Sequence, residues 1–333
     1  MGYRPAEDQG RADVETQLPM FDWVGDRAAR ITFGLQPVPL PRSPDPSRQV
    51  IDAGLLAEEL GFDAFYQPDH PAWAPECWVH LAALAVLTRR MRLGTVVACV
   101  PYRSAAHLAR LAADVDQLSR GRVVLGVGIG WDVPEFTRLG IPMAPVPDRQ
   151  ADLRRAIGTI RETWAGRPAS ADRPFLPPHR PDGPPIIIAG AGKRTLRLVA
   201  EVADGCNFGP SETTGGVQSP GAVRETLDVI AGHCREIGRP PEAILPTHFT
   251  SWVMLAKTEV AAAAKVARYY PDGMNETQRQ TRLVATPAAA VGYYQALADA
   301  GIRHFVAQSQ DATDHETYRL LATEVMPHVR CPA

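Results

Sequence analysis

Asp69 and His70 are the residues of this sequence whose types and adjacency most directly suggest acid–base chemistry. Histidine acts as a general acid or base near neutral pH because its unperturbed pKa is ~6.5. Asp69 can orient His70 or brace the loop that carries it, and a solvated loop histidine without a role is the alternative. No metal-binding set stands out among the nine histidines. We therefore predict a catalytic pair and no metal site.

A second segment, Gly126 to Trp131, places glycine at every other position. In a strand this spacing leaves one face bare, and a planar or bulky group can approach the backbone there. Gly128, Gly130 and Trp131 are thus candidates for a cavity wall, although the same spacing also occurs for packing reasons. The preceding apolar run, residues 91–99, ends at Cys99, a residue type that is more often a small buried hydrophobe than a reactive thiol.

A third segment, Gly190-Ala191-Gly192-Lys193-Arg194, combines glycines, the start of a helix and two cations. Together these features suit a phosphate group. A plain glycine turn with a solvated lysine and arginine is the alternative. Asn207, near the end of the next apolar run, can hydrogen-bond the edge of a ring.

Each of these segments follows a predicted strand in a regular alternation of strands and helices that begins at Ile31. The predicted strands cover residues 30–36, 63–67, 91–99, 123–129, 185–189, 205–208, 247–255 and 303–307. The predicted helices cover residues 47–60, 76–88, 104–119, 148–164, 194–202, 222–237, 258–270, 287–300 and 313–325. Gly61 is expected to end the first helix as its C-cap.

Eight parallel strands can close into a single (β/α)8 TIM barrel, which leaves no strand edge unpaired. The competing open, doubly wound sheet usually has fewer strands and a glycine fingerprint after the first one, where this chain has Pro37-Val38-Pro39. We predict the barrel. Its reactive groups then meet at the C-terminal ends of the strands.

The predicted domain is one barrel over residues 29–330, with loop insertions and a polar N-terminal tail over residues 1–28. Residues 166–184, rich in proline, arginine and glycine, are the main predicted insertion. In the tail, Phe21-Asp22-Trp23 is an apolar patch that can join a homodimer interface.

Composition narrows the remaining classes of function. The formal net charge of −2 gives no general attraction to nucleic acid or to an anionic membrane. No apolar run reaches the ~18 residues of a membrane helix, and no signal peptide core is present. The five cysteines form no CxxC pair and have no zinc spacing, which suits free thiols in a reducing cytoplasm.

The sequence resembles the luciferase-like monooxygenases, and among them the oxidoreductases that depend on the deazaflavin coenzyme F420. Many short motifs match in the correct order across roughly residues 31–329. They lie at residues 57–63, 69–70, 81–88, 91–95, 118–122, 126–131, 186–195, 203–205, 286–287, 300–301 and 325–328.

The resemblance implies roles for individual residues. His70 matches the position beside the reactive carbon of the deazaflavin ring, and Val96-Val97 matches a strand bulge that often holds a non-proline cis peptide under the ring. Cys99 matches a ring-edge position. In the same way, Gly128, Gly130 and Trp131 would line the cavity, and Gly190, Ala191, Gly192 and Lys193 would hold the phosphate-bearing side chain. The sugar-phosphate dehydrogenase branch has glutamate in place of Trp131, which argues against that substrate class.

Three functions remain open at this point. The first is hydride transfer between F420 and a small organic substrate, with His70 as the acid or base. The second is a monooxygenase that uses oxygen and reduced FMN supplied by a separate reductase; the cations Lys193 and Arg194 favour the longer anionic tail of F420 over FMN. The third is a cofactor-binding or light-emitting accessory protein without activity, against which the retained Asp69-His70 pair argues.

Overall fold

Eight parallel strands form a closed barrel in this computed structural model, which describes residues 30–39, 43–166, 176–180, 182–211 and 216–332. The order around the barrel is β1-β10-β7-β6-β5-β4-β3-β2. The barrel strands are β1 (Thr32–Pro37), β2 (Ala64–Gln67), β3 (Arg92–Cys99), β4 (Val123–Gly128), β5 (Ile186–Ala189), β6 (Gly205–Phe208), β7 (Leu245–Thr250) and β10 (His304–Ser309). The predicted (β/α)8 barrel is confirmed.

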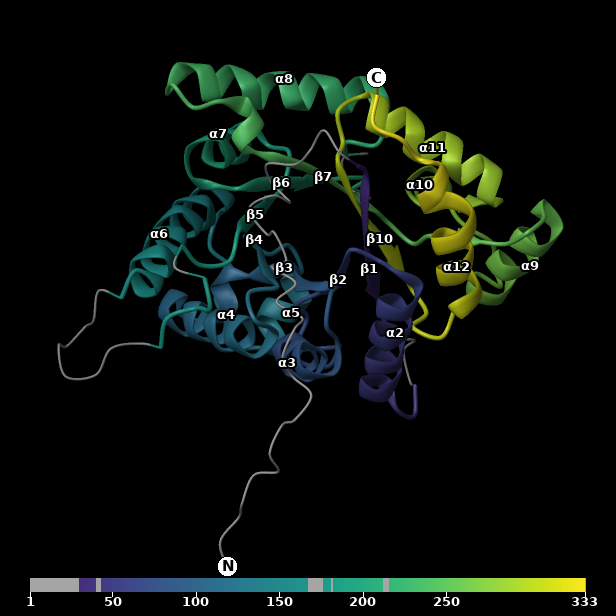
Figure 1. Cartoon of the computed structure of the whole chain (residues 1–333), viewed down its shortest axis with the longest axis horizontal. Coiled ribbons are helices and arrows are strands. Elements are labelled where there is room, and N and C mark those ends of the chain that lie inside the picture. Colours follow the sequence, from purple (N-terminus) through teal and green to yellow (C-terminus); the bar gives the residue numbers. More distant parts are fainter. Residues whose placement is uncertain (1–29, 40–42, 167–175, 181, 212–215, 333) are drawn as a thin grey trace, which may run out of the picture.

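A ring of helices surrounds the strands (Figure 1). The main ones are α2 (Pro46–Leu60), α3 (Cys77–Leu87), α4 (Ala105–Ser119), α6 (Val146–Trp164), α7 (Lys193–Val202), α8 (Pro220–Glu236), α11 (Pro287–Asp299) and α12 (His315–Leu320). Their boundaries follow local signals: the side chains of Asp45, Ser104 and Ser219 accept hydrogen bonds at the starts of α2, α4 and α8. Gly61 ends α2 in the left-handed conformation at φ 82°, as predicted.

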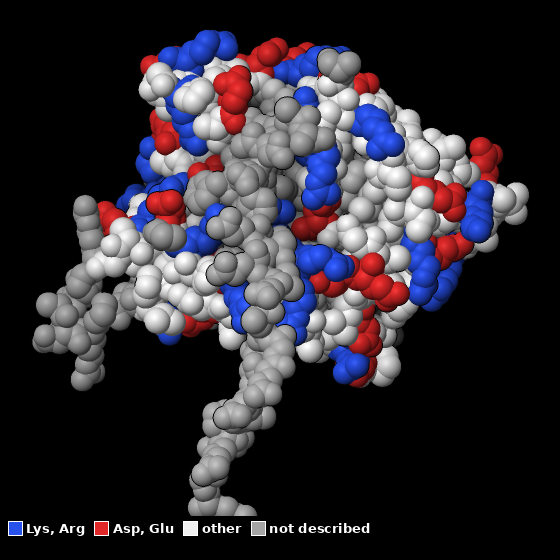
Figure 2. Space-filling model, viewed as in Figure 1, with Lys and Arg blue, Asp and Glu red and all other residues white. Residues whose placement is uncertain are grey.

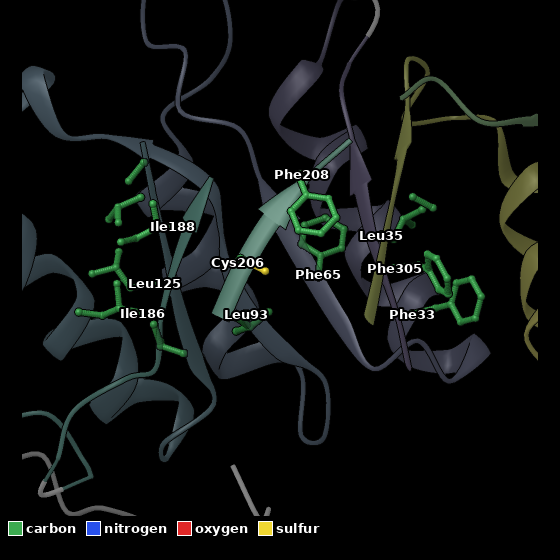
Figure 3. Close-up of a cluster of buried hydrophobic side chains, with 14 of the residues drawn as sticks. Phe33, Leu35, Phe65, Leu93, Leu125, Ile186, Ile188, Cys206, Phe208 and Phe305 are labelled. Atoms are coloured by element: carbon green, nitrogen blue, oxygen red, sulfur yellow. The ribbon is translucent and has the colours of Figure 1, made fainter. Parts of the chain in front are cut away.

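The main hydrophobic core lies between the strands and this ring of helices. Alternate residues of each strand face outward and pack on helix residues such as Leu84 of α3 and Ile160 of α6. Figure 3 shows the strand side of this core, with Phe33, Leu35, Phe65, Leu93, Leu125, Ile186, Ile188, Cys206, Phe208 and Phe305 labelled. The burial of so many large side chains fixes the barrel as a rigid support for the loops at its mouth.

The interior of the barrel holds polar groups near the N-terminal ends of the strands. The buried His304 ring contacts Thr32 Oγ1 at 2.8 Å through Nδ1 and the Tyr66 hydroxyl at 3.1 Å through Nε2. Burial, helped by the positive charge of Arg92, lowers the pKa of His304 to about 3. Tyr66 crosses the barrel only because Gly34 has no side chain, since a Cβ there would lie 2.5 Å from the Tyr66 ring.

Two predicted elements are wrong in extent. The predicted strand over residues 247–255 is two strands, because the chain turns at Trp252, where φ is 45°. After the turn, β8 (Met254–Leu255) pairs with β9 (Val284–Ala285) in a small separate sheet. The final helix was predicted from residue 313, but α12 begins at His315 and continues as a π-helical turn from Leu321.

Short helices in the loops were not predicted. They are α5 (Val133–Arg138) and α10 (Glu276–Thr281), while α9 (Glu259–Tyr269) matches the prediction for residues 258–270. The predicted tail over residues 1–28, its Phe21-Asp22-Trp23 patch and most of the 166–184 insertion lie outside the described residues.

Charges of both signs mix on the surface. Figure 2 shows Lys and Arg interspersed with Asp and Glu over the visible face. Every helix in the described ranges falls short of the length and apolar character needed to span a membrane.

Candidate active site at the mouth of the barrel

His70 lies in the loop after β2 and is held by Glu135 of α5. Its Nδ1 lies 2.6 Å from Oε2 of Glu135, which also accepts a hydrogen bond from the Tyr102 hydroxyl, while Oε1 accepts one from the Ala72 N–H. The Glu135 side chain is fully buried, whereas that of His70 is 17% exposed. Because Nδ1 donates to a carboxylate, Nε2 is left without a proton in the neutral ring. His70 can therefore take up or release a proton at Nε2.

Burial and the hydrogen bond to Glu135 raise the pKa of Tyr102 well above its ordinary value. The hydroxyl of Tyr102 is therefore protonated at neutral pH and donates to the carboxylate. Two donors from side chains and one from the backbone hold Glu135 in a single orientation. This carboxylate is a rigid support for the imidazole of His70.

Asp69 braces the loop through contacts with β3 and Arg103 rather than with His70. Its carboxylate accepts the Cys99 N–H at 3.0 Å and two guanidinium bonds from Arg103 at 2.5 and 2.9 Å. It thereby joins the end of β2 to the end of β3 and the start of α4. Of the two roles expected for Asp69, the contacts support bracing, and Glu135 orients the histidine instead.

The Val96–Val97 peptide bond is cis, as the family resemblance implied. It lies in β3, where the register with β4 shifts between Thr95 and Ala98. Buried Gln36 of β1 donates to the Val96 carbonyl at 2.6 Å, and Gln308 of β10 donates to Gln36 at 3.0 Å. Three strands thus fix this peptide at the mouth of the barrel.

The glycines of β4 make room for the β3 bulge. A Cβ on Gly128 would lie 2.7 Å from a methyl group of Val97, and one on Gly126 would lie 2.1 Å from the Thr95 carbonyl oxygen. The bare face predicted for an approaching ligand is therefore filled by the chain itself at these two positions. Gly130 has a φ of 74° and packs against Cys99 and Phe136.

Cys99 and Trp131 differ strongly in exposure. Cys99 is buried, and this burial raises the pKa of its thiol to about 12, which suits the buried hydrophobe interpretation rather than a reactive thiol. Trp131 follows Gly130 with 72% of its surface exposed, and its ring stands at 75° to the His70 ring with 5.9 Å between the centroids.

The segment after β5 has the features of an anion site. Gly190 has a φ of 128°, and Gly192 is the N-cap of α7 without a side-chain acceptor for the first N–H groups. Ala191 and Lys193 are exposed beside it. No side chain caps the first N–H groups of α7, and uncapped N–H groups beside a lysine suit a phosphate.

Asn207 of β6 lies inside the barrel. It is buried, and its Nδ2 donates to Thr247 Oγ1 at 2.7 Å. Thr247 in turn donates to the Cys206 carbonyl at 2.8 Å. The amide nitrogen of Asn207 is therefore engaged with a neighbouring strand of the barrel.

Two clusters in the described ranges can each offer three ligand atoms within 4.8 Å: His70, Asp132 and Glu135, and Asp69, Glu76 and Cys77. Hydrogen bonds already engage both. Glu135 holds His70 and Tyr102, while Arg103 pairs with Asp69 at 2.5 Å and with Glu76 at 2.8 Å. Arg103 gives the second cluster a charge partner, whereas Glu135 in the first cluster is held by hydrogen bonds.

The site therefore combines residues that the sequence pointed to with others that it did not. His70, the Val96–Val97 pair and the start of α7 stand where they were predicted. Glu135 was missed, although Asp132 and Pro134 form a helix-start signal just before it. Together the groups define an α/β-barrel protein with its reactive side chains at the C-terminal ends of the strands, the usual place for a barrel active site.

The model of the luciferase-like monooxygenase family matches residues 30–322, and the chain belongs to this family. An F420-dependent glucose-6-phosphate dehydrogenase of Microbacterium testaceum is 28% identical over 322 residues, covering 85% of this chain and 93% of that protein.

Solved structures with the same fold include enzymes of both cofactor types. An F420-dependent secondary alcohol dehydrogenase in complex with an F420-acetone adduct has a TM-score of 0.73 at 19% identity, covering 90% of this chain and 99% of that one. The oxygenating constituent of 3,6-diketocamphane monooxygenase from Pseudomonas putida, in complex with FMN, also has a TM-score of 0.73, at 17% identity, covering 91% of this chain and all of that one.

Proposed function

We propose that this protein is an F420-dependent oxidoreductase that oxidises or reduces a small organic substrate, with His70 as the acid or base. The observation that carries this proposal is the 2.6 Å contact between His70 and buried Glu135 at the mouth of the barrel. When bound, F420 accepts a hydride from the substrate or returns one to it. His70 takes the accompanying proton at Nε2 during oxidation and supplies it during reduction.

The residues of the mouth fit such a cofactor. Val96, Val97 and Cys99 of β3 would support its ring, with Gly130 and Trp131 on the cavity wall and Asn207 at a ring edge. Gly190, Ala191, Gly192 and Lys193 would hold its phosphate-bearing side chain, because the start of α7 offers uncapped N–H groups beside a cation. Asp69 would keep the loop of His70 in place. The chain itself binds, orients and shields the reacting groups.

The second candidate is a monooxygenase that uses oxygen and reduced FMN from a separate reductase. This candidate is supported by the structural similarity to an FMN-bound monooxygenase, whose TM-score equals that of the F420-dependent secondary alcohol dehydrogenase. The relatives named as F420-dependent and the cations Lys193 and Arg194 support the first candidate.

Calorimetric titration of the protein with F420 and with FMN distinguishes the two. We expect F420 to bind and FMN to bind more weakly, and we expect turnover without oxygen uptake. Tighter binding of reduced FMN, together with oxygen consumption, would establish the monooxygenase instead. In the F420-loaded enzyme, His70→Ala should lower turnover by about 10²- to 10⁴-fold and leave cofactor binding intact.

We also propose that the protein is a cytoplasmic homodimer and that α3 contributes to its interface. This helix is apolar on all sides, and Val79, Val86 and Leu87 are at least half exposed on it. Such a helix at the surface of a barrel is typical of one that packs against another subunit. The Phe21-Asp22-Trp23 patch stays a prediction.

A further inference from the structure

Two tryptophans flank the imidazole of His70. The Trp73 ring stacks on it with 4.3 Å between the centroids and 22° between the planes, and Trp131 meets it at a steep angle. Trp73 comes from the loop after β2 and Trp131 from the loop after β4. Both are exposed, at 50% and 72% of their surfaces. A large aromatic surface therefore adjoins the nitrogen that we assign to proton transfer.

The described charged groups around His70 leave no cation free for a substrate. Glu135 is buried under hydrogen bonds from His70, Tyr102 and the backbone. Among the described residues of this network, Arg103 carries the positive charge, and its guanidinium already pairs with Asp69 and Glu76. No cation in these contacts is left to bind a phosphate or carboxylate of a substrate. Beside the His70 ring lie the two indole rings and the carboxylate of Asp132, which offers an oxygen within 4.8 Å and adds negative charge rather than a partner for an anion.

We propose that Trp73 and Trp131 form the substrate site with His70, and that the substrate is an uncharged secondary alcohol or ketone that carries an aromatic or alicyclic ring. The ring of the substrate packs on the indoles, because flat apolar groups gain both buried area and aromatic contact there. Its oxygen meets Nε2 of His70. On oxidation, the carbon gives a hydride to F420 and the hydroxyl gives a proton to Nε2, which leaves a ketone. This inference rests on the proposed function for the redox step only.

The test measures binding of 1-phenylethanol and acetophenone to the F420-loaded enzyme by calorimetry, with glucose 6-phosphate and tetramethylammonium as contrasting probes. We expect the two aryl compounds to bind and both charged probes to bind at least about tenfold more weakly. Trp131→Ala should weaken aryl binding by about tenfold, while Trp131→Phe, which keeps an aromatic ring, should retain most of it. Val133→Ala, at an exposed apolar residue two positions further on, at the start of α5, is the matched control and should change nothing.

The outcomes separate the two proposals. Binding of glucose 6-phosphate that Trp131→Ala leaves unchanged would overturn the substrate class and leave the F420 reaction standing. Tighter binding of tetramethylammonium than of the aryl compounds would also overturn it, because the indoles would then act on a cation. Failure of F420 to bind, with aryl binding still dependent on Trp131, would overturn the F420 reaction and support the aromatic site.

Discussion

At the scale of single residues, the orientation and the tautomer of His70 depend on a carboxylate 65 positions further along the chain. Glu135 fixes which nitrogen carries the proton, and Tyr102 and the Ala72 N–H fix Glu135. His70 would otherwise be free to rotate and to exchange its two protonated forms. Glu135 is thus a positioning residue for the proposed reaction.

Glu135→Gln should lower turnover by up to the about 10²- to 10⁴-fold that general acid–base catalysis contributes, because the amide can present its NH2 group to Nδ1 and reverse the tautomer. The measurement is turnover against pH, with cofactor affinity measured separately. The limb of the profile that reports His70 should shift, whereas a merely structural role would lower turnover without moving it. Glu324→Gln, at an exposed residue of the C-terminal helical segment, is the control.

At the residue level, positions at the ends of strands could be predicted where the signal is local. His70 belongs to a short motif that follows a strand, and Val96–Val97 belongs to one within a strand. Such motifs consist of neighbouring residues and can be recognised in the sequence. Glu135 contributes through a contact between α5 and the loop after β2. The spacing of residues 70 and 135 in the sequence does not indicate this contact. The glycines of β4 show the opposite difficulty, because their pattern was clear but the group that fills the space is Val97.

At the scale of elements, the start of α7 is the feature that we propose to set cofactor affinity. Its first N–H groups have no side-chain cap, and Lys193 is exposed next to them. An anion there gains from the N–H groups, from the helix dipole and from the lysine.

Lys193→Ala should raise the dissociation constant of the phosphate-bearing cofactor by about tenfold, which corresponds to about 1.4 kcal/mol. The loss should shrink at high salt, because screening weakens the same interaction in the unaltered protein. Lys257→Ala, at an exposed lysine before α9, should leave the affinity as it is. Equal affinities for the Lys193→Ala variant and the unaltered protein would place the phosphate elsewhere.

The exposed face of α3 leads to a prediction about assembly. Val79 and Val86 lie seven residues apart on that helix and so on the same side. Replacing both by glutamate should convert a dimer to a monomer in light scattering, because burying the charges costs more than the lost apolar contact alone. Val260→Glu on α9, where the valine is 82% exposed, is the control and should remain dimeric. A dimer that survives the double change would exclude α3 from the interface.

Elements with strong periodicity were predictable, and short loop elements were not. Seven of the barrel strands were predicted to within a few residues because each is an apolar run between turn signals. The eighth was extended too far, since residues 247–255 contain no glycine or proline to mark a break and only the turn at Trp252 divides them. A helix of six residues such as α10 has too few turns to show a period.

At the scale of the whole molecule, barrel closure brings the predicted segments together. Pairing of β1 with β10 places Gln36 beside Gln308, and through them the first and last strands support the cis peptide of β3. Strand counting predicted this closure. It did not predict that polar groups fill the barrel interior near the N-terminal ends of the strands. Residues such as Thr32, Tyr66 and His304 are far apart in the sequence, and their spacing does not show that they contact one another.

These interior groups predict how stability depends on pH. Burial lowers the pKa of His304 to about 3 and that of His248, buried on the outer side of β7, to about 4. Below pH 6.5 the unfolded chain therefore binds protons that the folded chain does not, so the free energy of unfolding falls as the pH falls from about 6.5 towards 4. Each histidine contributes about 1.4 kcal/mol for each pH unit in that window.

Denaturant unfolding at pH 7 and pH 5 measures the effect. His248→Gln should reduce the loss of stability between the two values, since the variant lacks one of the groups that the unfolded state protonates. His328→Gln, at an exposed histidine, should show the full loss. The same loss in both variants would mean that His248 is solvated rather than buried as a neutral ring.

Because Trp73 stacks on His70, the fluorescence of Trp73 can report the protonation state of the histidine. A protonated imidazole quenches an indole in contact with it more strongly than a neutral one does, so the emission of Trp73 follows the protonation of the very group that is proposed to move the proton. The difference in emission between the protein and its Trp73→Phe variant, recorded against pH, gives a titration curve for that single ring. No substrate, label or turnover is needed, and the same signal can be followed through a reaction in real time.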